Sequence, residues 1–167
     1  MIAPILLAEL DHEAATTRKV FERLPDNLFT YKPTEKSGTL GWTAAHIAQM
    51  LEWGAVTMKT ESFDINPPGG PAYQPPKADS QAELLAMFEK NLAAFRAAIQ
   101  GASDADFMAP WSLLSGGQVA FTMPRGACIR SMIMNHIVHH RGQLTVYMRL
   151  NGIPIPSIYG PSGDEPM

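Results

Sequence analysis

Cysteine is almost absent from the chain of 167 residues, since Cys128 is the only one. A single cysteine excludes an internal disulfide framework and suits a reducing compartment. Charged residues are also scarce, at 17% with a net charge of −3, and no basic stripe is present to bind nucleic acid. No run of about 18 apolar residues offers a membrane span, and no positive charge precedes the short apolar run at the start. We therefore expect a soluble, cytoplasmic protein without nucleic-acid or membrane partners.

What the chain does contain is helical periodicity, in a composition that is 46% hydrophobic. Apolar residues recur at spacings of three and four over four stretches, which predict long helices at residues 2–24, 39–61, 80–100 and 125–151. Ser80 and Glu83 have the spacing of a capping box at the start of the third helix. The length fits a single domain over residues 1–167. The expected fold class is all-α, a four-helix bundle with long crossover loops.

The connections differ in composition from the helices. Residues 62–79 are dense in proline and glycine, which predicts neither helix nor regular strand, and Phe63 and Tyr73 can anchor this segment as an ordered cover. Residues 102–124 predict a short helical turn and then a small β-hairpin around Gly116 and Gly117, before the last helix. After residue 151 the proline-rich tail is expected to form an extended strap.

Histidines are the candidate metal ligands. His136 and His140 lie four residues apart in an apolar stripe of the last predicted helix, with Cβ atoms about 6 Å apart, a separation that lets two imidazoles bind one ion. His139 projects to the side and is expected to be a flank residue. His46 lies on the inward face of the second predicted helix, and three histidines are the number that a catalytic zinc site takes from protein. A core histidine that finds a hydrogen-bond partner is the competing interpretation of each residue.

Three segments resemble the DinB-like family of bacterial damage-inducible, metal-dependent proteins. They are N-H-I-V-H-H-R-G-Q-L-T-V-Y-M-R-L-N-G at 135–152, G-W-T-A-A-H-I at 41–47 and I-Y-G-P-S-G-D-E at 158–165. The resemblance covers nearly the whole chain. It implies a four-helix bundle, usually dimeric, in which His46, His136 and His140 hold zinc, nickel or a similar divalent ion. Related members of the wider superfamily use low-molecular-weight thiols such as glutathione, mycothiol and bacillithiol, and many others have no assigned reaction.

The residues favour thiol chemistry over hydrolysis. Three imidazoles leave a coordination position for a thiolate or water, and a metal-bound thiol is deprotonated near neutral pH. Hydrolysis usually needs a carboxylate as general base, and no Asp or Glu adjoins any of the three histidines. We therefore expect a metal-dependent S-transferase or isomerase acting on a small-molecule substrate, with no catalytic residue assigned beyond the ligands. The alternatives are a metal-dependent hydrolase and a structural or stress-response bundle without catalysis.

Several residues near the three histidines can be interpreted in two ways. Arg141 and Gln143 either orient the site or belong to an ordinary helix end. Trp42 and Trp53 either line a pocket or belong to the core. A second, partly apolar flank of the last predicted helix predicts a homodimer. Its residues are Cys128, Met132, His139 and Val146.

Overall fold

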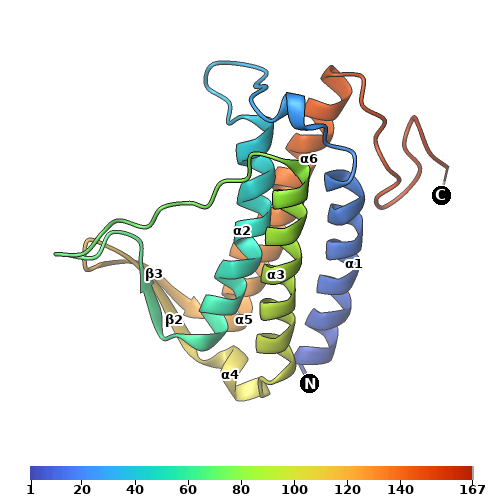
Figure 1. The fold of residues 1–167 in the computed structure, drawn as a ribbon. Helices are drawn as coiled ribbons and strands as arrows, with labels where there is room; N and C mark the ends of the chain where they lie inside the picture. Colours follow the sequence, from blue (N-terminus) through green and yellow to red (C-terminus); the bar gives the residue numbers. More distant parts are fainter. Residues whose placement is uncertain (167) are drawn as a thin grey trace.

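The computed structural model describes residues 1–166, and four long helices dominate it. They are α1 (Ala3–Phe21), α2 (Leu40–Lys59), α3 (Gln81–Gln100) and α6 (Asn135–Leu150). All four run along the same axis, and α2 contacts both α3 and α6, while α1 packs on α3 and α6 (Figure 1). Each corresponds to a helix predicted from the sequence, so the mostly helical character is confirmed. No helix among residues 1–166 is long and apolar enough to cross a membrane.

Polar caps fix where two of the long helices, α2 and α3, begin. Thr39 precedes α2, and its side chain accepts a hydrogen bond from the main-chain N–H of Trp42 at 3.1 Å. Ser80 precedes α3 and accepts from the N–H of Glu83 at 3.2 Å. The carboxylate of Glu83 accepts from the N–H of Asp79 instead of Ser80, so only half of the predicted capping box forms.

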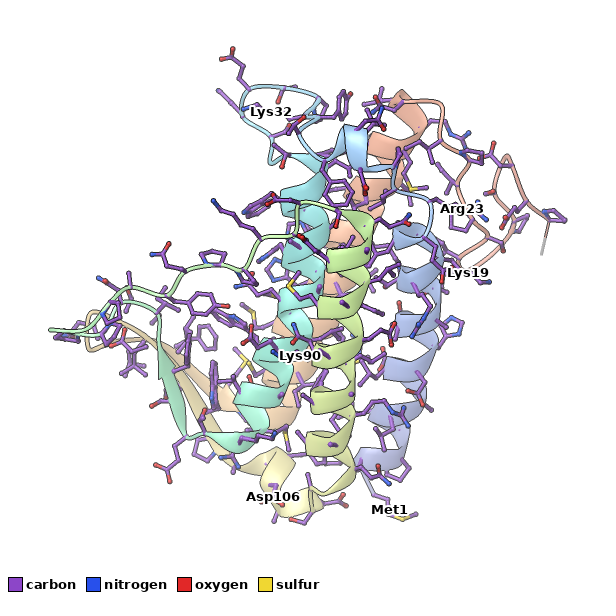
Figure 2. All side chains as sticks on the ribbon, viewed as in Figure 1. Met1, Lys19, Arg23, Lys32, Lys90 and Asp106 are labelled. Atoms are coloured by element: carbon purple, nitrogen blue, oxygen red, sulfur yellow. The ribbon has the colours of Figure 1, made fainter. Side chains whose placement is uncertain are left out.

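Apolar side chains from all four long helices meet in one core (Figure 2). Buried members include Leu10, Phe21, Ile47, Leu51, Phe88, Phe95 and Leu144. Gly54 lets α2 and α3 approach closely, because a Cβ atom there would lie 2.6 Å from the ring of Phe95. Figure 2 places Met1 and Asp106 at one end of the molecule and Lys32 at the other, with the helices between them.

A small sheet stands beside the lower end of α2 and departs from the all-α prediction (Figure 1). Strands β2 (Pro110–Ser115) and β3 (Gln118–Pro124) form the predicted hairpin, after the short helix α4 (Asp104–Met108). Gly116 and Gly117 both have positive φ, as the tight turn between these strands requires.

Strand β1 (Ser62–Asp64) pairs in parallel with β2 and completes the order β1-β2-β3. The prediction that residues 62–79 contain no strand is therefore wrong at their start. Asp64 accepts hydrogen bonds from the N–H groups of Gly116 and Gly117 at 3.2 and 2.7 Å, which ties β1 to the hairpin turn. Such a strand depends on a distant partner, and local composition does not reveal it.

The last helical stretch is interrupted by a π-helical segment. It comprises α5 (Arg125–Cys128), the π segment η2 (Ile129–Met134) and α6. A π turn holds more residues than an α turn, so buried positions continue at spacings of four through Ile133, Ile137 and Arg141. His136 and His140, which were predicted to lie within the apolar stripe, are half-buried at its edge.

Candidate metal centre

Three histidines from two helices converge beside the core. His46 comes from α2, and His136 and His140 come from successive turns of α6. Their candidate ligand atoms all lie within 4.8 Å of one another. The Nε2 atoms of His46 and His136 are 3.4 Å apart, and the three ring centroids are separated by 4.7, 4.8 and 5.0 Å. The structure thus brings together the three histidines singled out in the sequence.

Two glutamines determine which nitrogens face the centre. Nδ1 of His46 lies 2.9 Å from Oε1 of Gln49, and Nδ1 of His140 lies 2.7 Å from Oε1 of Gln143. An amide oxygen only accepts hydrogen bonds, so each Nδ1 carries the proton and donates it. The Nε2 atom of each ring then bears the lone pair that a metal ion needs.

His136 is held by its own helix. It forms a hydrogen bond with the main chain of Met132, one turn earlier. Nδ1 is the atom left for this bond, because Nε2 faces His46. Three Nε2 lone pairs therefore point into one small space, an arrangement that is unfavourable until a cation lies among them. The donor set and its outer hydrogen bonds fit a divalent ion that accepts imidazole.

Burial keeps the imidazoles of His136 and His140 neutral. Desolvation, reinforced by the neighbouring histidines, lowers the pKa of His140 to about 4 despite its hydrogen bond to Gln143. Desolvation and the charge that His46 can carry also lower the pKa of His136. Near neutral pH both rings are therefore neutral and each has one nitrogen without a proton, so a metal ion does not have to displace a proton from either.

The residues beside His140 separate into different roles. Gln143 orients His140, which resolves one of the two interpretations left open by the sequence. His139 is exposed, lies outside the three-histidine cluster and contacts the amide nitrogen of Gln143 at 3.2 Å. Gln49 was not recognised as an orienting residue. A signal for it existed, because His-x-x-Gln occurs at 46–49 and again at 140–143, and a spacing of three places both side chains on one helix face.

Arg141 turns away from the histidines. The residue is 1% exposed, and its guanidinium lies 2.7 Å from the carboxylate of Glu13 on α1. It also donates to the hydroxyls of Thr16 and Thr17 at 2.7 and 3.1 Å. Tyr159 of the tail closes the cluster by donating to Glu13 at 2.8 Å. Arg141 is thus part of a buried ion pair that joins α1, α6 and the tail.

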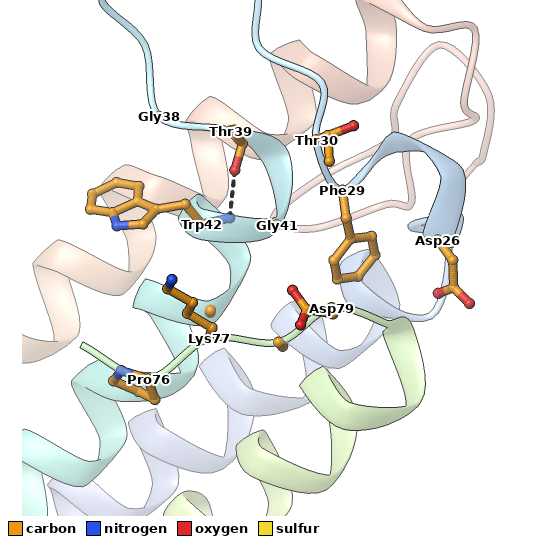
Figure 3. A pocket seen from close by; sticks show the side chains of 12 residues that line it. Asp26, Phe29, Thr30, Gly38, Thr39, Gly41, Trp42, Pro76, Lys77 and Asp79 are labelled. Atoms are coloured by element: carbon orange, nitrogen blue, oxygen red, sulfur yellow. Dashed lines mark hydrogen bonds between the residues drawn. The ribbon is translucent and has the colours of Figure 1, made fainter. Parts of the chain in front are cut away.

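Trp42 separates the histidines from a pocket of about 690 Å³. Its indole stacks on His46 with ring centroids 5.0 Å apart and planes inclined by 13°, and it remains 47% exposed. Figure 3 shows Trp42 and Phe29 on different sides of this pocket, with Lys77 and Asp79 reaching it from the segment before α3. Gly38 leaves room for the indole, since a Cβ atom there would lie 2.5 Å from the ring. The pocket therefore adjoins the histidine cluster through one aromatic side chain.

Cys128 does not lie on the outer flank assigned to it. It is 1% exposed, its sulfur faces the hydroxyl of Thr57, and burial raises the pKa of its thiol. Met132 and Val146 are exposed at 39% and 57%. The flank expected to form a dimer is thus smaller than predicted.

The chain is similar to known proteins over nearly its whole length. The model of the DinB family matches residues 3–166. An uncharacterized protein of Bacillus subtilis, YrdA, is 29% identical over 160 residues, which are 95% of this chain and 89% of that protein.

Two solved structures share the fold. A DinB-like protein of Bacillus cereus superposes with a TM-score of 0.68 at 25% identity, covering 92% of this chain and 95% of its own. A second DinB-like protein, YjoA of Bacillus subtilis, has the same TM-score at 18% identity, with coverages of 90% and 94%. Because the family model spans nearly the whole sequence, the chain belongs to the DinB family.

Proposed function

We propose that this chain binds one divalent metal ion, zinc or nickel, through His46, His136 and His140, and uses it in S-transferase or isomerase chemistry on a low-molecular-weight thiol. The observation that carries the metal assignment is the convergence of three oriented Nε2 atoms from α2 and α6. A purely structural zinc site normally takes four protein ligands. Among residues 1–166 the cluster contains three, which leaves a position for a substrate.

The surroundings of the cluster favour a thiol over water as the activated group. A divalent ion held there lowers the pKa of a bound thiol, so that the thiolate is available without a separate base. The polar groups that touch His46 and His140 are the amides of Gln49 and Gln143. Within residues 1–166 no carboxylate hydrogen-bonds to any of the three imidazoles, so a general base for hydrolysis is not in place.

The pocket beside Trp42 supports an organic substrate. Its volume lies in the range of small-molecule sites. Trp42 and Phe29 give it apolar walls, and Lys77 and Asp79 add one charge of each sign. We infer that the non-thiol part of the substrate lies here, with the indole of Trp42 between it and the ligand His46.

Two further expectations accompany this function. The pairwise packing of α1, α2, α3 and α6 supports the four-helix bundle implied by the family. The exposed side chains of Met132 and Val146 support a homodimer through the outer flank of the last helix.

Elemental analysis of purified protein, followed by a thiol screen, tests the proposal. We expect about one equivalent of divalent metal per chain and metal-dependent consumption of a thiol in the presence of an electrophile. The matched control is the His140→Ala variant, which should be inactive with every thiol. Full metal occupancy without any thiol turnover would favour the structural alternative, and turnover of esters or amides would favour hydrolysis.

A further inference from the structure

A chain of hydrogen bonds leads from His46 to the surface of α2. Nδ1 of His46 contacts Oε1 of Gln49 at 2.9 Å, and Nε2 of Gln49 donates to the hydroxyl of Tyr73 at 2.8 Å. The hydroxyl of Tyr73 in turn donates to the carboxylate of Glu52, at the longer distance of 3.5 Å. Gln49 is 3% exposed, so its amide depends on these two partners. The chain thus connects a candidate metal ligand to a tyrosine in the connection between α2 and α3.

The direction of each bond follows from the last acceptor. An ionised carboxylate only accepts, so the proton of the Tyr73 hydroxyl points to Glu52. The oxygen of Tyr73 is then free to accept, which requires the NH₂ end of Gln49 to face it. The carbonyl end of Gln49 must face His46, and Nδ1 of His46 must carry the proton. The opposite direction would place the proton on Nε2 of His46 and block the metal.

Tyr73 is itself held in place. Its ring lies edge-on to the rings of Trp53 and Phe63, with centroids 5.7 and 5.5 Å away, and its N–H donates to the carbonyl of Ile65 at 2.8 Å. The expectation that Phe63 and Tyr73 anchor the segment after α2 agrees with these contacts. The side chain of Tyr73 therefore both anchors the segment after α2 and takes part in orienting His46.

The corresponding branch at His140 ends on an imidazole instead of a carboxylate. There the amide nitrogen of Gln143 meets Nε2 of His139, an exposed imidazole. A neutral imidazole has one donor and one acceptor nitrogen, so His139 can accept from this amide in only one of its two tautomers, and it is not a fixed acceptor as Glu52 is. The branch at His46 ends on a carboxylate and has no such freedom.

We propose that Tyr73 is a positioning residue of the metal centre, which acts through Gln49 to keep His46 in the tautomer whose Nε2 can bind metal. The proposal rests on the metal-binding function proposed above. It assigns a role to the connection between α2 and α3, which lies outside the three-histidine cluster. Phe at this position keeps the aromatic packing and removes only the hydroxyl, so Tyr73→Phe isolates the hydrogen bond.

The experiment has a readout that does not involve metal. In metal-free protein, imidazole ¹H–¹⁵N spectra report which ring nitrogen of His46 is protonated. We expect the Nδ1–H form in the unaltered protein and an appreciable Nε2–H population in Tyr73→Phe. Zinc titration by calorimetry should then show about threefold to tenfold weaker binding. This is no more than the smallest loss of affinity expected when a residue that hydrogen-bonds directly to a metal ligand is replaced. Tyr31→Phe, whose ring packs on Tyr147 away from the histidines, is the matched control and should change neither quantity.

Each outcome bears on the proposal. An unchanged His46 tautomer in Tyr73→Phe overturns it, whatever happens to zinc affinity, because any loss of affinity would then be a packing effect. A changed tautomer with unchanged zinc affinity also overturns it. If the tautomer changes but the unaltered protein binds no zinc, the metal-binding function fails while the hydrogen-bond chain stands. Glu52→Gln removes the carboxylate that fixes the direction and should show the same tautomer shift with a smaller amplitude.

Discussion

His140 and Arg141 are neighbours in α6, yet they belong to polar clusters of opposite character. Arg141 is buried against Glu13, Thr16 and Thr17, so its charge and donors are satisfied by protein. His140 is half-buried, and its Nε2 faces other imidazole nitrogens that offer it no donor. Buried polar groups that find their partners within the protein, as around Arg141, hold elements of a fold together. Acceptors that converge without a donor, as around His140, indicate a site for a cation.

The largest effect is expected from removing a ligand of the histidine cluster. His136→Ala or His140→Ala should abolish stoichiometric metal binding, because two imidazoles hold a divalent ion far less tightly than three. Metal content after gel filtration measures this. His139→Ala and His12→Ala, which alter exposed histidines outside the cluster, should retain a full equivalent. If His136→Ala and His140→Ala retained the metal, the three-histidine cluster would not be the metal site.

Changing the cluster around Arg141 should lower the free energy of unfolding of the protein. Arg141→Ala leaves the carboxylate of Glu13 buried without its partner, which costs about 3–5 kcal/mol of unfolding free energy. Denaturant unfolding measures it. Replacing both charges by apolar residues, Arg141→Met with Glu13→Leu, should recover much of the loss, since the unpaired charge is then gone. If Arg141→Ala removed metal from protein that remains folded, the two clusters would not be independent.

Acid should affect the histidine cluster through protonation. Folding lowers the pKa of His140 from 6.5 to about 4, so below pH 6.5 the unfolded chain binds the extra proton and the folded chain does not. The free energy of unfolding of the metal-free protein should therefore fall as the pH drops from about 6.5 to about 4. His140→Ala should flatten this dependence. Proton competition with metal at His140 should also begin nearer pH 4 than the value of free histidine suggests.

The smallest effect concerns Trp42. Because its indole stacks on His46, a paramagnetic ion such as Ni²⁺ in the cluster should quench its fluorescence. Trp42→Phe should remove most of this quenching and leave metal stoichiometry unchanged. Fluorescence titration with Ni²⁺ measures it, and Trp111, which is 2% exposed and belongs to β2, should contribute little. Undiminished quenching in Trp42→Phe would place the metal elsewhere.

The sequence was sufficient for what depends on local periodicity. Spacings of three and four located the long helices, and the separation of His136 from His140 indicated that both could reach one ion. The tight turn at Gly116 and Gly117 was equally local. These features need no knowledge of distant partners, because they follow from the geometry of one element.

What the sequence did not predict depends on distant contacts or on small changes of helical register. Strand β1 exists because β2 offers it a partner some fifty residues later. Arg141 could not be distinguished from an exposed helix residue without Glu13, which approaches from α1. The edge position of the histidines follows from the π segment, and a search for uniform α periodicity does not detect such a segment.

That π segment also means that the centre depends on how the chain winds between Pro124 and His136. In an α-helix one residue corresponds to about 100° of rotation. The π turn takes up one extra residue within almost the same rotation, so converting 129–134 to regular α geometry at unchanged length would rotate everything after it by about that angle relative to α5. The histidines would then leave α2, and Arg141 would leave Glu13, although every one of these side chains would still be present. The alignment of the two clusters thus depends on the extra residue being taken up in the π turn.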